Sequence, residues 1–542
     1  MRETDGERES RRGREGMLPE LTYADLVQLG ASRHGDEDAL VLGEARVSFQ
    51  RLADEVEAFQ LRLAKMGVAP GDKVALLGTN TPAWMAAMLA TMAAGAVAVP
   101  LNARDPLEGL AYTILASDAT HVLYAERYAR RDMSELPGSL AERGWRGGCV
   151  TFEAAARLRE QLPATRSDGM AGPGGAATAA PGDLGIILFT SGSTSRPKGC
   201  MLTQQGMIRN ALLHTERLGI TPEDRWFSPM PFFHAGGLIW GITSMLVSGA
   251  TLVSQERFDA EQALDLIERE RCTYHHGIDA MFVAEMNSPT FTQERVRSLR
   301  IANSTGSSEL LRSIHDRMGI AGIVSKWGIS EGYGNLTLSA PSDSLEKRLC
   351  TVGRGYPGIE YRIVDPATGE IDFGRSGEIQ VRGSSMSGYY NDPDATSALI
   401  DSDGWLATGD RGAFDGDGYL HYEGRLKEML KVGGENVSLA EVESALMQHP
   451  SVELAVVVGA EHPRLEEVPV AFVVPRAGAE RLTPGELEAF GRERLADFKV
   501  PVAYVTTSIE QIPTTGSGKV ARRSLGSEVA ERVASGELAL GR

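Results

Sequence analysis

Two kinds of residue pattern alternate along most of the chain. Short apolar runs, such as residues 73–77 and 96–100, stand between longer stretches with helical spacing of apolar residues. Runs of this kind are typical of buried strands, and the longer stretches are typical of amphipathic helices. From Leu18 to about Phe152, and again from Thr251 to Arg300, the alternation predicts a layered α/β fold.

The pattern changes twice in the second half of the chain. Between Thr351 and Tyr422, short apolar segments are separated by turn-forming pairs, which predicts a small barrel-like β region. After Gly424 the pattern favours a separate α+β domain, whose length of roughly 115 residues is usual for a domain. Its predicted elements are a hairpin around Gly433-Gly434, a helix over 439–448, strands over 452–458 and 469–474, and a helix over 484–496.

We therefore predict a large N-terminal domain over 17–424 and a smaller C-terminal α+β domain over 425–542. A chain of 542 residues is too long for one compact core, which agrees with this division. Residues 1–16 alternate Arg with Asp and Glu and contain no apolar run, so we expect a disordered tail rather than a signal peptide. Met17 is an alternative start.

Composition excludes several classes of partner. A formal net charge of -18 argues against nucleic acid, which requires basic surfaces. The longest apolar stretch, Ala83 to Val99, is short and rich in alanine, so it favours a buried helix and a strand over a membrane span. The four cysteines lie far apart and are typical of reduced thiols, which predicts a cytoplasmic protein. The sequence leaves the oligomeric state open.

The chemistry begins with a loop rich in hydroxyl groups at residues 188–200, Leu-Phe-Thr-Ser-Gly-Ser-Thr-Ser-Arg-Pro-Lys-Gly-Cys. It lies between a predicted strand and a predicted helix. Its glycines are expected to allow unusual backbone conformations, while its hydroxyls and its lysine suit phosphate. A Walker A loop would need Gly-Lys-Ser/Thr at its end, and here Pro197 precedes the lysine. The predicted phosphate ligands are Thr190, Ser191, Gly192, Ser193, Thr194 and Lys198.

This Thr-Ser-Gly-Ser-Thr-x-x-Pro-Lys-Gly spacing resembles the signature loop of the adenylate-forming superfamily, which includes acyl-CoA synthetases, luciferases and adenylation domains of nonribosomal peptide synthetases. The resemblance continues in order through most of the chain and is strongest to the acyl-CoA ligases. It implies that the loop holds the β- and γ-phosphates of ATP while an acid attacks the α-phosphate. ATP, Mg²⁺ and CoA are the implied cofactors.

The same resemblance assigns the rest of the nucleotide site. Residues 327–331, Trp-Gly-Ile-Ser-Glu, are similar to the aromatic-Gly-x-Thr-Glu motif of the family. Glu331 is the expected Mg²⁺ ligand, because Mg²⁺ is commonly held by one carboxylate with phosphates and waters. Trp327 is expected to stack on adenine, with a core tryptophan as the alternative. The further nucleotide-site residues implied are Gly306, Ser307, Gly328 and Ser330, together with Asp410 and Arg425 at the ribose.

A second motif, Pro-Thr-Thr-Gly-Ser-Gly-Lys at 513–519, resembles the C-terminal loop of the family. Its lysine, Lys519, is implied to bridge the substrate carboxylate and the α-phosphate. A cation placed there stabilises the charge that develops in the transition state. Lys427 in Gly-Arg-Leu-Lys is the implied hinge about which the C-terminal domain rotates as a mobile lid. Lys431 and Asn436 are implied to lie near the acyl-adenylate, and Gly433 and Gly434 leave space for a pantetheine arm.

The acyl pocket is predicted less completely. Phe-Phe-His at 232–234 resembles a stretch whose ring gates the pocket, so His234 joins Lys198, Lys431 and Lys519 as a predicted catalytic residue. Gly306 and Asn436 are the other implied pocket residues. Asp279 stands where the family commonly has Pro; it either contacts a polar group on the acid or caps a helix over 280–286. His275 and His276 share this ambiguity, and Gln204 replaces a frequent His.

The predicted function is ATP-dependent activation of a carboxylic acid to an acyl-adenylate, followed by thioester formation with CoA. The alternatives are an enzyme that loads a carrier-protein pantetheine, a luciferase-like oxygenase, and a relative that activates another oxyanion such as nitrite. Residues 353–358 fit G-x-G-x-x-G, but they precede a strand-like segment instead of the helix that a dinucleotide site needs. NAD is therefore excluded.

Overall fold

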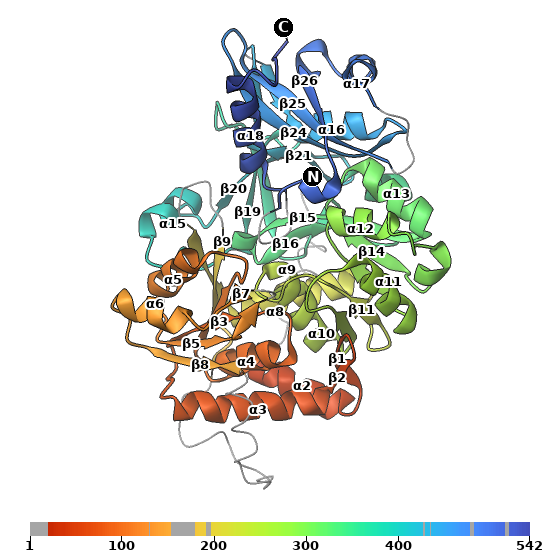
Figure 1. Cartoon of the computed structure of the whole chain (residues 1–542). Coiled ribbons are helices and arrows are strands. Elements are labelled where there is room, and N and C mark those ends of the chain that lie inside the picture. Colours follow the sequence, from red (N-terminus) through yellow and green to blue (C-terminus); the bar gives the residue numbers. More distant parts are fainter. Residues whose placement is uncertain are drawn as a thin grey trace.

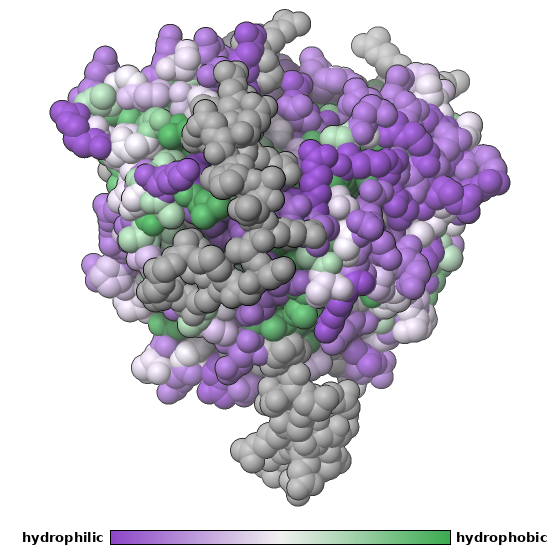
Figure 2. Space-filling view, turned by 90° about the horizontal axis from the view of Figure 1, so that it is seen from below, coloured by the Kyte–Doolittle hydropathy of each residue, from purple (hydrophilic) through white to green (hydrophobic). Residues whose placement is uncertain are grey.

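The computed structural model describes residues 20–128, 131–152, 179–190, 197–426, 429–433, 435–476, 482–514 and 520–541 (Figure 1). The predicted tail at 1–16 lies outside these ranges. No helix within them is long and apolar enough to cross a membrane. Hydrophilic side chains cover most of the face shown in Figure 2, and apolar ones form small separate areas.

The first sheet carries the strand that leads into the predicted phosphate loop. Its neighbouring strands run parallel, except for the antiparallel pair β9 and β10. The strands in spatial order are β10 (Lys198–Thr203), β9 (Leu184–Thr190), β4 (Val97–Leu101), β3 (Lys73–Leu77), β5 (His121–Tyr124) and β8 (Gly148–Thr151). The helices α5 (Leu107–Ala116) and α6 (Leu136–Glu142) pack on it, and β6 (Arg127–Tyr128) pairs with β7 (Arg131–Asp132).

The second sheet has nine strands and is parallel through its centre. In spatial order they are β17 (Arg354–Gly355), β16 (Gly334–Leu338), β15 (Gly322–Ile329), β14 (Ile301–Ser304), β13 (Tyr274–His276), β11 (Arg225–Phe227), β12 (Thr251–Ser254), β1 (Asp38–Leu42) and β2 (Ala45–Ser48). The helices on its two sides are α2 (Tyr23–His34), α3 (Phe49–Lys65), α8 (Gln204–Leu218), α10 (Ser244–Ser248), α11 (Ala260–Arg269), α12 (Asp279–Met286), η3 (Gln293–Val296), α13 (Ser308–Met318) and α14 (Leu345–Cys350).

The core between these sheets contains α4 (Pro82–Ala93), which is buried from Trp84 to Met92. Thr81 caps this helix by accepting a hydrogen bond from the backbone N–H of Trp84, and Pro82 occupies its first turn. The helix then leads into β4, which is buried throughout. The prediction of a buried helix and a strand for residues 83–99 is therefore confirmed.

A third, antiparallel sheet follows, with the strands β18 (Glu360–Val364), β19 (Gly377–Arg382), β20 (Leu406–Phe414) and β21 (Leu420–Arg425), and with α15 (Pro393–Leu399) between the second and third. It replaces the predicted barrel-like region with an open sheet. In the described residues β18 and β21 are its edges, because no pairing between them closes it. The strand β18 directly follows residues 353–358, as the exclusion of NAD required.

The C-terminal unit is built around β24 (Val452–His462) and β25 (Glu466–Pro475). Its other elements are β22 (Met429–Val432), β23 (Glu435–Ser438), α16 (Leu439–Met447), α17 (Pro484–Arg492), η6 (Asp497–Lys499), β26 (Ala503–Thr506), η7 (Ile509–Gln511) and α18 (Arg522–Ala534). The predicted hairpin is present, since β22 and β23 pair around Gly433, which has a φ of 59°.

The C-terminal unit lies against the N-terminal one through α16 and α13 (Figure 1). Ser444 and Gln448 donate hydrogen bonds to the carboxylate of Glu309, at 2.8 and 3.2 Å. Arg317 at the end of α13 forms an ion pair of 3.4 Å with Glu453. These polar contacts define the orientation of the two units in this structure.

Candidate active site

The phosphate loop is anchored by a strand on each side. Strand β9 ends at Thr190 and β10 begins at Lys198, and these two residues face each other in the antiparallel register. Ser191, Gly192, Ser193 and Thr194 lie outside the described residues. Gly199 has no positive φ; a Cβ there would lie 2.6 Å from Cγ2 of Ile187, so close packing requires this glycine. The expected backbone freedom at Gly199 is therefore wrong.

Lys198 is half-buried beside the loop. Its Nζ lies 3.6 Å from a carboxylate oxygen of Asp392 and 5.2 Å from the centre of the Tyr389 ring. Tyr389 and Asp392 both follow β19, a strand of the third sheet, and are far from Lys198 in sequence. The lysine is therefore held at the start of β10 by a charge and a ring face, and its contact with a phosphate stays a prediction.

Glu331 lies in the short helix η4 (Ser330–Gly332), directly after β15. The hydroxyl of Tyr389 donates a 2.8 Å hydrogen bond to Oε1 of Glu331, and the backbone N–H of Met386 donates to its carbonyl. Burial and the nearby carboxylate of Glu331 raise the pKa of Tyr389, so this phenol stays protonated as a donor.

Glu331 offers one carboxylate to a metal ion. Mg²⁺ prefers oxygen ligands and is commonly held by one protein carboxylate, with phosphates and waters as its other ligands. The carboxylate therefore fits Mg²⁺ by its chemistry, and its role as the metal ligand stays a prediction. In the described part of the chain, no three His, Cys, Asp or Glu side chains come together as a metal site.

Asp410 is the centre of the predicted ribose site. It is 2% exposed, and Nε1 of Trp327 donates a 2.8 Å hydrogen bond to its Oδ2. Nε of Arg425 lies 3.0 Å from its Oδ1, because β20 and β21 pair these two residues directly. Three residues that are far apart in sequence are thus brought together as the resemblance implied.

A close approach explains the glycine that follows Trp327. A Cβ on Gly328 would lie 1.7 Å from the carbonyl oxygen of Gly334, so only glycine fits at this crossing of β15 and β16. Trp327 itself is buried, and its indole N–H is bound to Asp410. This hydrogen bond fixes the ring beside the ribose site; stacking on adenine stays a prediction.

Asp279 and Gly306 also lie together. Oγ of Ser304, the last residue of β14, donates a 2.6 Å hydrogen bond to Oδ1 of Asp279. A Cβ on Gly306 would come within 3.1 Å of that same oxygen. Ile278, not Asp279, is the N-cap of α12, so the alternative in which Asp279 caps the helix is wrong. Asp279 instead occupies the first helical turn, where a carboxylate is stabilised by the helix dipole.

His234 begins a turn of helix that borders the same region. Its Nδ1 accepts a hydrogen bond from the backbone N–H of Gly236, and so caps α9 (Ala235–Gly237). The chain continues into the π-helix η2 (Leu238–Thr243), a rare element that is frequent at functional sites. Asn80 holds the segment before it, by accepting from the N–H of Phe232 and donating to the carbonyl of Met230.

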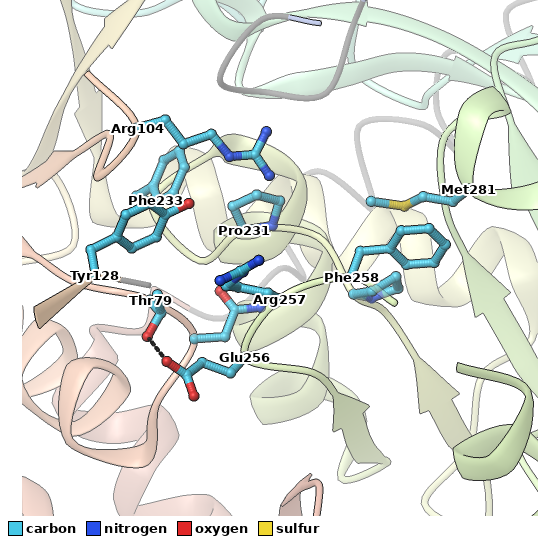
Figure 3. Close-up of a pocket in the computed structure, with 11 residues that line it drawn as sticks. Thr79, Arg104, Tyr128, Pro231, Phe233, Glu256, Arg257, Phe258 and Met281 are labelled. Atoms are coloured by element: carbon cyan, nitrogen blue, oxygen red, sulfur yellow. Dashed lines mark hydrogen bonds between the residues drawn. The ribbon is translucent and has the colours of Figure 1, made fainter. Parts of the chain in front are cut away.

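A pocket opens beside this segment (Figure 3). It encloses about 440 Å³, open solvent at its mouth included. Figure 3 shows the guanidinium groups of Arg104 and Arg257 pointing toward the space around Pro231. Tyr128 and Phe233 line one side, Phe258 and Met281 line the other, and Thr79 donates a 2.9 Å hydrogen bond to Glu256. Two cations and several aromatic rings therefore surround one opening.

Comparison with known proteins decides the family. The model of the AMP-binding enzyme family matches residues 27–390, and that of the AMP-binding enzyme C-terminal domain matches residues 441–519. The chain belongs to the AMP-binding enzyme family.

Relatives and solved structures agree with this assignment. The acyl-CoA ligase sidI of Aspergillus fumigatus is 31% identical over 95% of this chain and 92% of its own length. A feruloyl-CoA synthase of an Amycolatopsis species is 34% identical over 90% and 94%. The ATP-bound MatB of Rhodopseudomonas palustris superposes with a TM-score of 0.81 and 25% identity, over 94% of this chain and 99% of MatB. Together the relatives support an AMP-forming acid–thiol ligase.

The C-terminal residues of this AMP-binding enzyme are only partly described. Lys427, Gly434 and Lys519 lie outside the described residues, as does the side chain of Asn436. Lys431 is exposed on β22 and pairs with Asn436 across the hairpin, and its backbone N–H donates to Glu467. The catalytic, hinge and pantetheine roles of these residues stay predictions.

One predicted site residue and one unusual residue have structural contacts in this AMP-binding enzyme. Ser307 caps α13 by accepting from the N–H of Leu310, a role that its position before a helical run could have indicated. Gln204 is fully buried; it accepts from the N–H of Tyr23 and donates to the carbonyl of Met92. The departure from histidine at Gln204 therefore serves packing between α2, α4 and α8.

Proposed function

We propose that this chain is an AMP-forming acyl-CoA ligase in which Glu331, Asp410 and Lys519 act in adenylation and Arg104 and Arg257 receive CoA. In the first step a carboxylate oxygen of the acid attacks the α-phosphorus of ATP, and pyrophosphate leaves. In the second step the thiolate of CoA attacks the acyl carbonyl, the bond to phosphate breaks, and AMP leaves.

The contact of Trp327 and Arg425 with the buried Asp410 carries the adenylation proposal. A buried carboxylate with fixed donors is arranged to accept hydrogen bonds from neutral hydroxyl groups of a bound sugar, which is what ribose offers. Glu331 lies four residues after Trp327 and supports Mg²⁺ at the phosphates. Lys198, the first residue of β10, supplies a cation for the β- and γ-phosphates, and Lys519 supplies the cation at the α-phosphate.

The pocket of Figure 3 supports free CoA rather than a carrier protein as the acceptor. CoA carries a diphosphate and a 3′-phosphate, and guanidinium groups are the preferred side chains for phosphate. Phe233 in the pocket wall directly precedes His234, so a thiol arm entering past Arg104 and Arg257 would arrive at the predicted acyl site. A carrier protein would bring only the single phosphodiester of its pantetheine arm.

Replacement of the pocket arginines tests this acceptor assignment. We expect Arg104→Ala and Arg257→Ala to raise KM for CoA about 3- to 10-fold each, because exposed charge–phosphate contacts are of modest strength. KM for pantetheine, which lacks phosphate, should change little, and acid-dependent exchange of pyrophosphate into ATP should be unchanged. Arg33→Ala, on the exposed side of α2, is the matched control.

Two outcomes would contradict the assignment. Equal use of CoA and pantetheine by the unaltered enzyme would show that the phosphates of CoA are not recognised. The second outcome is efficient acyl transfer to a carrier-protein pantetheine with no transfer to CoA. It would show that a carrier protein is the acceptor, and it would leave the adenylation proposal unchanged.

A further inference from the structure

One short segment of the chain contacts both the backbone and the side chain of Glu331. This segment, residues 386–392, follows β19 and is referred to as the strap. The backbone N–H of Met386 donates a 2.7 Å hydrogen bond to the carbonyl of Glu331, and the hydroxyl of Tyr389 donates a 2.8 Å hydrogen bond to its Oε1. The strap therefore fixes the direction of the carboxylate that we propose for Mg²⁺.

The strap also contacts the first sheet beside Lys198. The backbone N–H of Tyr390 donates a 2.8 Å hydrogen bond to the carbonyl of Gly199, so the strap pairs with β10 directly after Lys198. Asp392 adds the ion pair of 3.6 Å with Nζ of Lys198. Because Glu331 follows a strand of the second sheet, the strap connects the two sheets at the two charged groups proposed for the phosphate site.

An acidic residue anchors the strap to the first sheet. Oδ2 of Asp118 accepts a 2.9 Å hydrogen bond from the hydroxyl of Tyr390 and a 3.0 Å hydrogen bond from the side-chain amide of Asn391. Asp118 is the second residue after α5, in the turn that leads to β5 (Figure 1). Burial and the contact with Asp118 raise the pKa of Tyr390 to about 12, so its hydroxyl stays protonated as the donor.

The backbone at this anchor is unusual on both sides. Asp118 has a φ of 53° and Asn391 has a φ of 54°, in the left-handed region that residues other than glycine seldom adopt. Conformations of this kind persist where the surrounding contacts compensate for them, and they are frequent at functional sites. The contact between Asp118 and Asn391 supplies such compensation.

Solvent borders part of the strap. A hollow of about 1010 Å³, open solvent included, is lined by residues of the strap and of α15. Side chains therefore do not pack around the whole strap, and its hydrogen bonds contribute to its position where packing does not. Loss of the anchor should move the strap more easily than the sheets that it connects.

We propose that the strap sets the spacing between Glu331 and Lys198 for Mg²⁺ and ATP, and that Asp118 is a positioning residue for adenylation that acts through the strap. A metal ion held by phosphate oxygens and a lysine that meets the same phosphates need one fixed spacing, because small displacements of such groups strongly lower binding and rate. Removal of the anchor should therefore weaken the binding of Mg²⁺ and of ATP together. This inference rests on the adenylation proposed above.

Asp118→Gly tests the anchor, because glycine accepts the positive φ and the substitution removes the carboxylate. We expect KM for ATP and the Mg²⁺ concentration for half-maximal pyrophosphate exchange each to rise about 3- to 10-fold, with a smaller change in kcat. Thioester formation from acyl-adenylate supplied to the enzyme needs no β- or γ-phosphate and should be unchanged. Arg271→Gly is the matched control, because Arg271 has a φ of 50° and is the second residue after α11.

Two further variants separate positioning from a general loss of structure. Asp118→Asn keeps an oxygen acceptor and a residue type that tolerates positive φ, so it should retain more of the affinity for ATP than Asp118→Gly. Tyr390→Phe removes one donor and should raise the same two constants by a smaller factor. In combination with Asp118→Gly, the effect of Tyr390→Phe should be largely lost, since both act on one contact.

Unchanged KM for ATP and unchanged Mg²⁺ dependence in Tyr390→Phe and Asp118→Gly would overturn the inference. If Asp118→Gly does not fold, the result with Tyr390→Phe alone decides. Equal losses of rate in both half-reactions, with KM values unchanged, would also overturn it, because they would show a merely structural role. Exchange without acid in the unaltered enzyme would instead contradict the proposed function, before any variant is compared.

Discussion

At the scale of single residues, the site depends on side chains whose partners come from distant parts of the chain. Glu331 receives the hydroxyl of Tyr389, and Asp410 receives Trp327 and Arg425. Each acid is held by donors that leave its charge in place. Because the proposed partners of these acids, Mg²⁺ and the ribose hydroxyls, need oxygen atoms in fixed positions, small changes at the two carboxylates should alter function more than stability.

Glu331→Gln should show this most directly. The amide keeps the size of the side chain but removes the charge that attracts Mg²⁺, so we expect the Mg²⁺ concentration for half-maximal adenylation to rise about 10-fold or more. Titration of pyrophosphate exchange with Mg²⁺ measures this. Tyr389→Phe, which keeps the carboxylate, serves as the comparison; an identical Mg²⁺ dependence for Glu331→Gln and the unaltered enzyme would exclude Glu331 as the ligand.

Lys519→Ala tests the cation proposed at the α-phosphate. Removal of one charged donor from a developing transition state commonly lowers the rate by roughly 10²- to 10³-fold, and we expect that loss in kcat for acyl-adenylate formation. Thioester formation from acyl-adenylate supplied to the enzyme should be much less affected. Normal adenylation by Lys519→Ala would rule out the role.

At the scale of elements, α12 is fixed to the second sheet by a buried pair. His275 and Glu285 are both fully buried, and Nε2 of His275 lies 2.9 Å from the carboxylate. The ring of His275 also packs on Phe227 and Phe282. The imidazole of His275 therefore positions the helix that begins with Asp279.

Loss of one partner in this pair should be costly. Glu285→Ala leaves the buried His275 imidazole without its hydrogen-bond partner, so we expect a loss of about 1–3 kcal/mol in the free energy of unfolding. Glu268→Ala on α11 breaks an ion pair with Arg295 of η3 in which the glutamate is 54% exposed, and it should cost about 1 kcal/mol or less. Denaturant unfolding measures the loss of stability in each variant. Equal losses in Glu285→Ala and Glu268→Ala would show that the buried pair stabilises the fold no more than the ion pair of Glu268 does.

How far the sequence predicts the structure also depends on scale. The buried α4, the hairpin around Gly433 and the meeting of Trp327, Asp410 and Arg425 follow from local pattern or from motifs. The burial of Lys326 was missed because one lysine in an apolar run looks like an exposed strand residue; only the fold reveals its contacts with His276, Asn303 and Trp240. Arg104 and Arg257 belong to no quoted motif and meet only in the fold.

At the scale of the whole molecule, the two units make polar contacts at Glu309 and Arg317, and Ile509 of the C-terminal unit packs against the core of the second sheet. Interfaces of this kind are compatible with relative motion of domains. The predicted hinge at Lys427 would allow the C-terminal unit to present Lys519 for adenylation and the hairpin around Gly433 for thioester formation.

Glu309→Ala should shift the balance between the two half-reactions. The substitution removes both hydrogen bonds that α16 donates to Glu309. It should therefore make the orientation of the two units seen in this structure less stable relative to the second orientation, which the predicted rotation about Lys427 would produce. We expect the ratio of pyrophosphate exchange to single-turnover thioester formation to change about 3- to 10-fold, as for the loss of one or two modest hydrogen bonds. Equal effects on both rates would speak against two alternating orientations.

The central claim is that the chain joins an acid to a thiol through an acyl-adenylate. Its most direct test is isotopic exchange of pyrophosphate into ATP, measured with and without acid and in the absence of CoA. The account predicts exchange only when an acid is present, and AMP with a CoA thioester as products once CoA is added. Exchange that needs no acid, or release of ADP and phosphate, would contradict it.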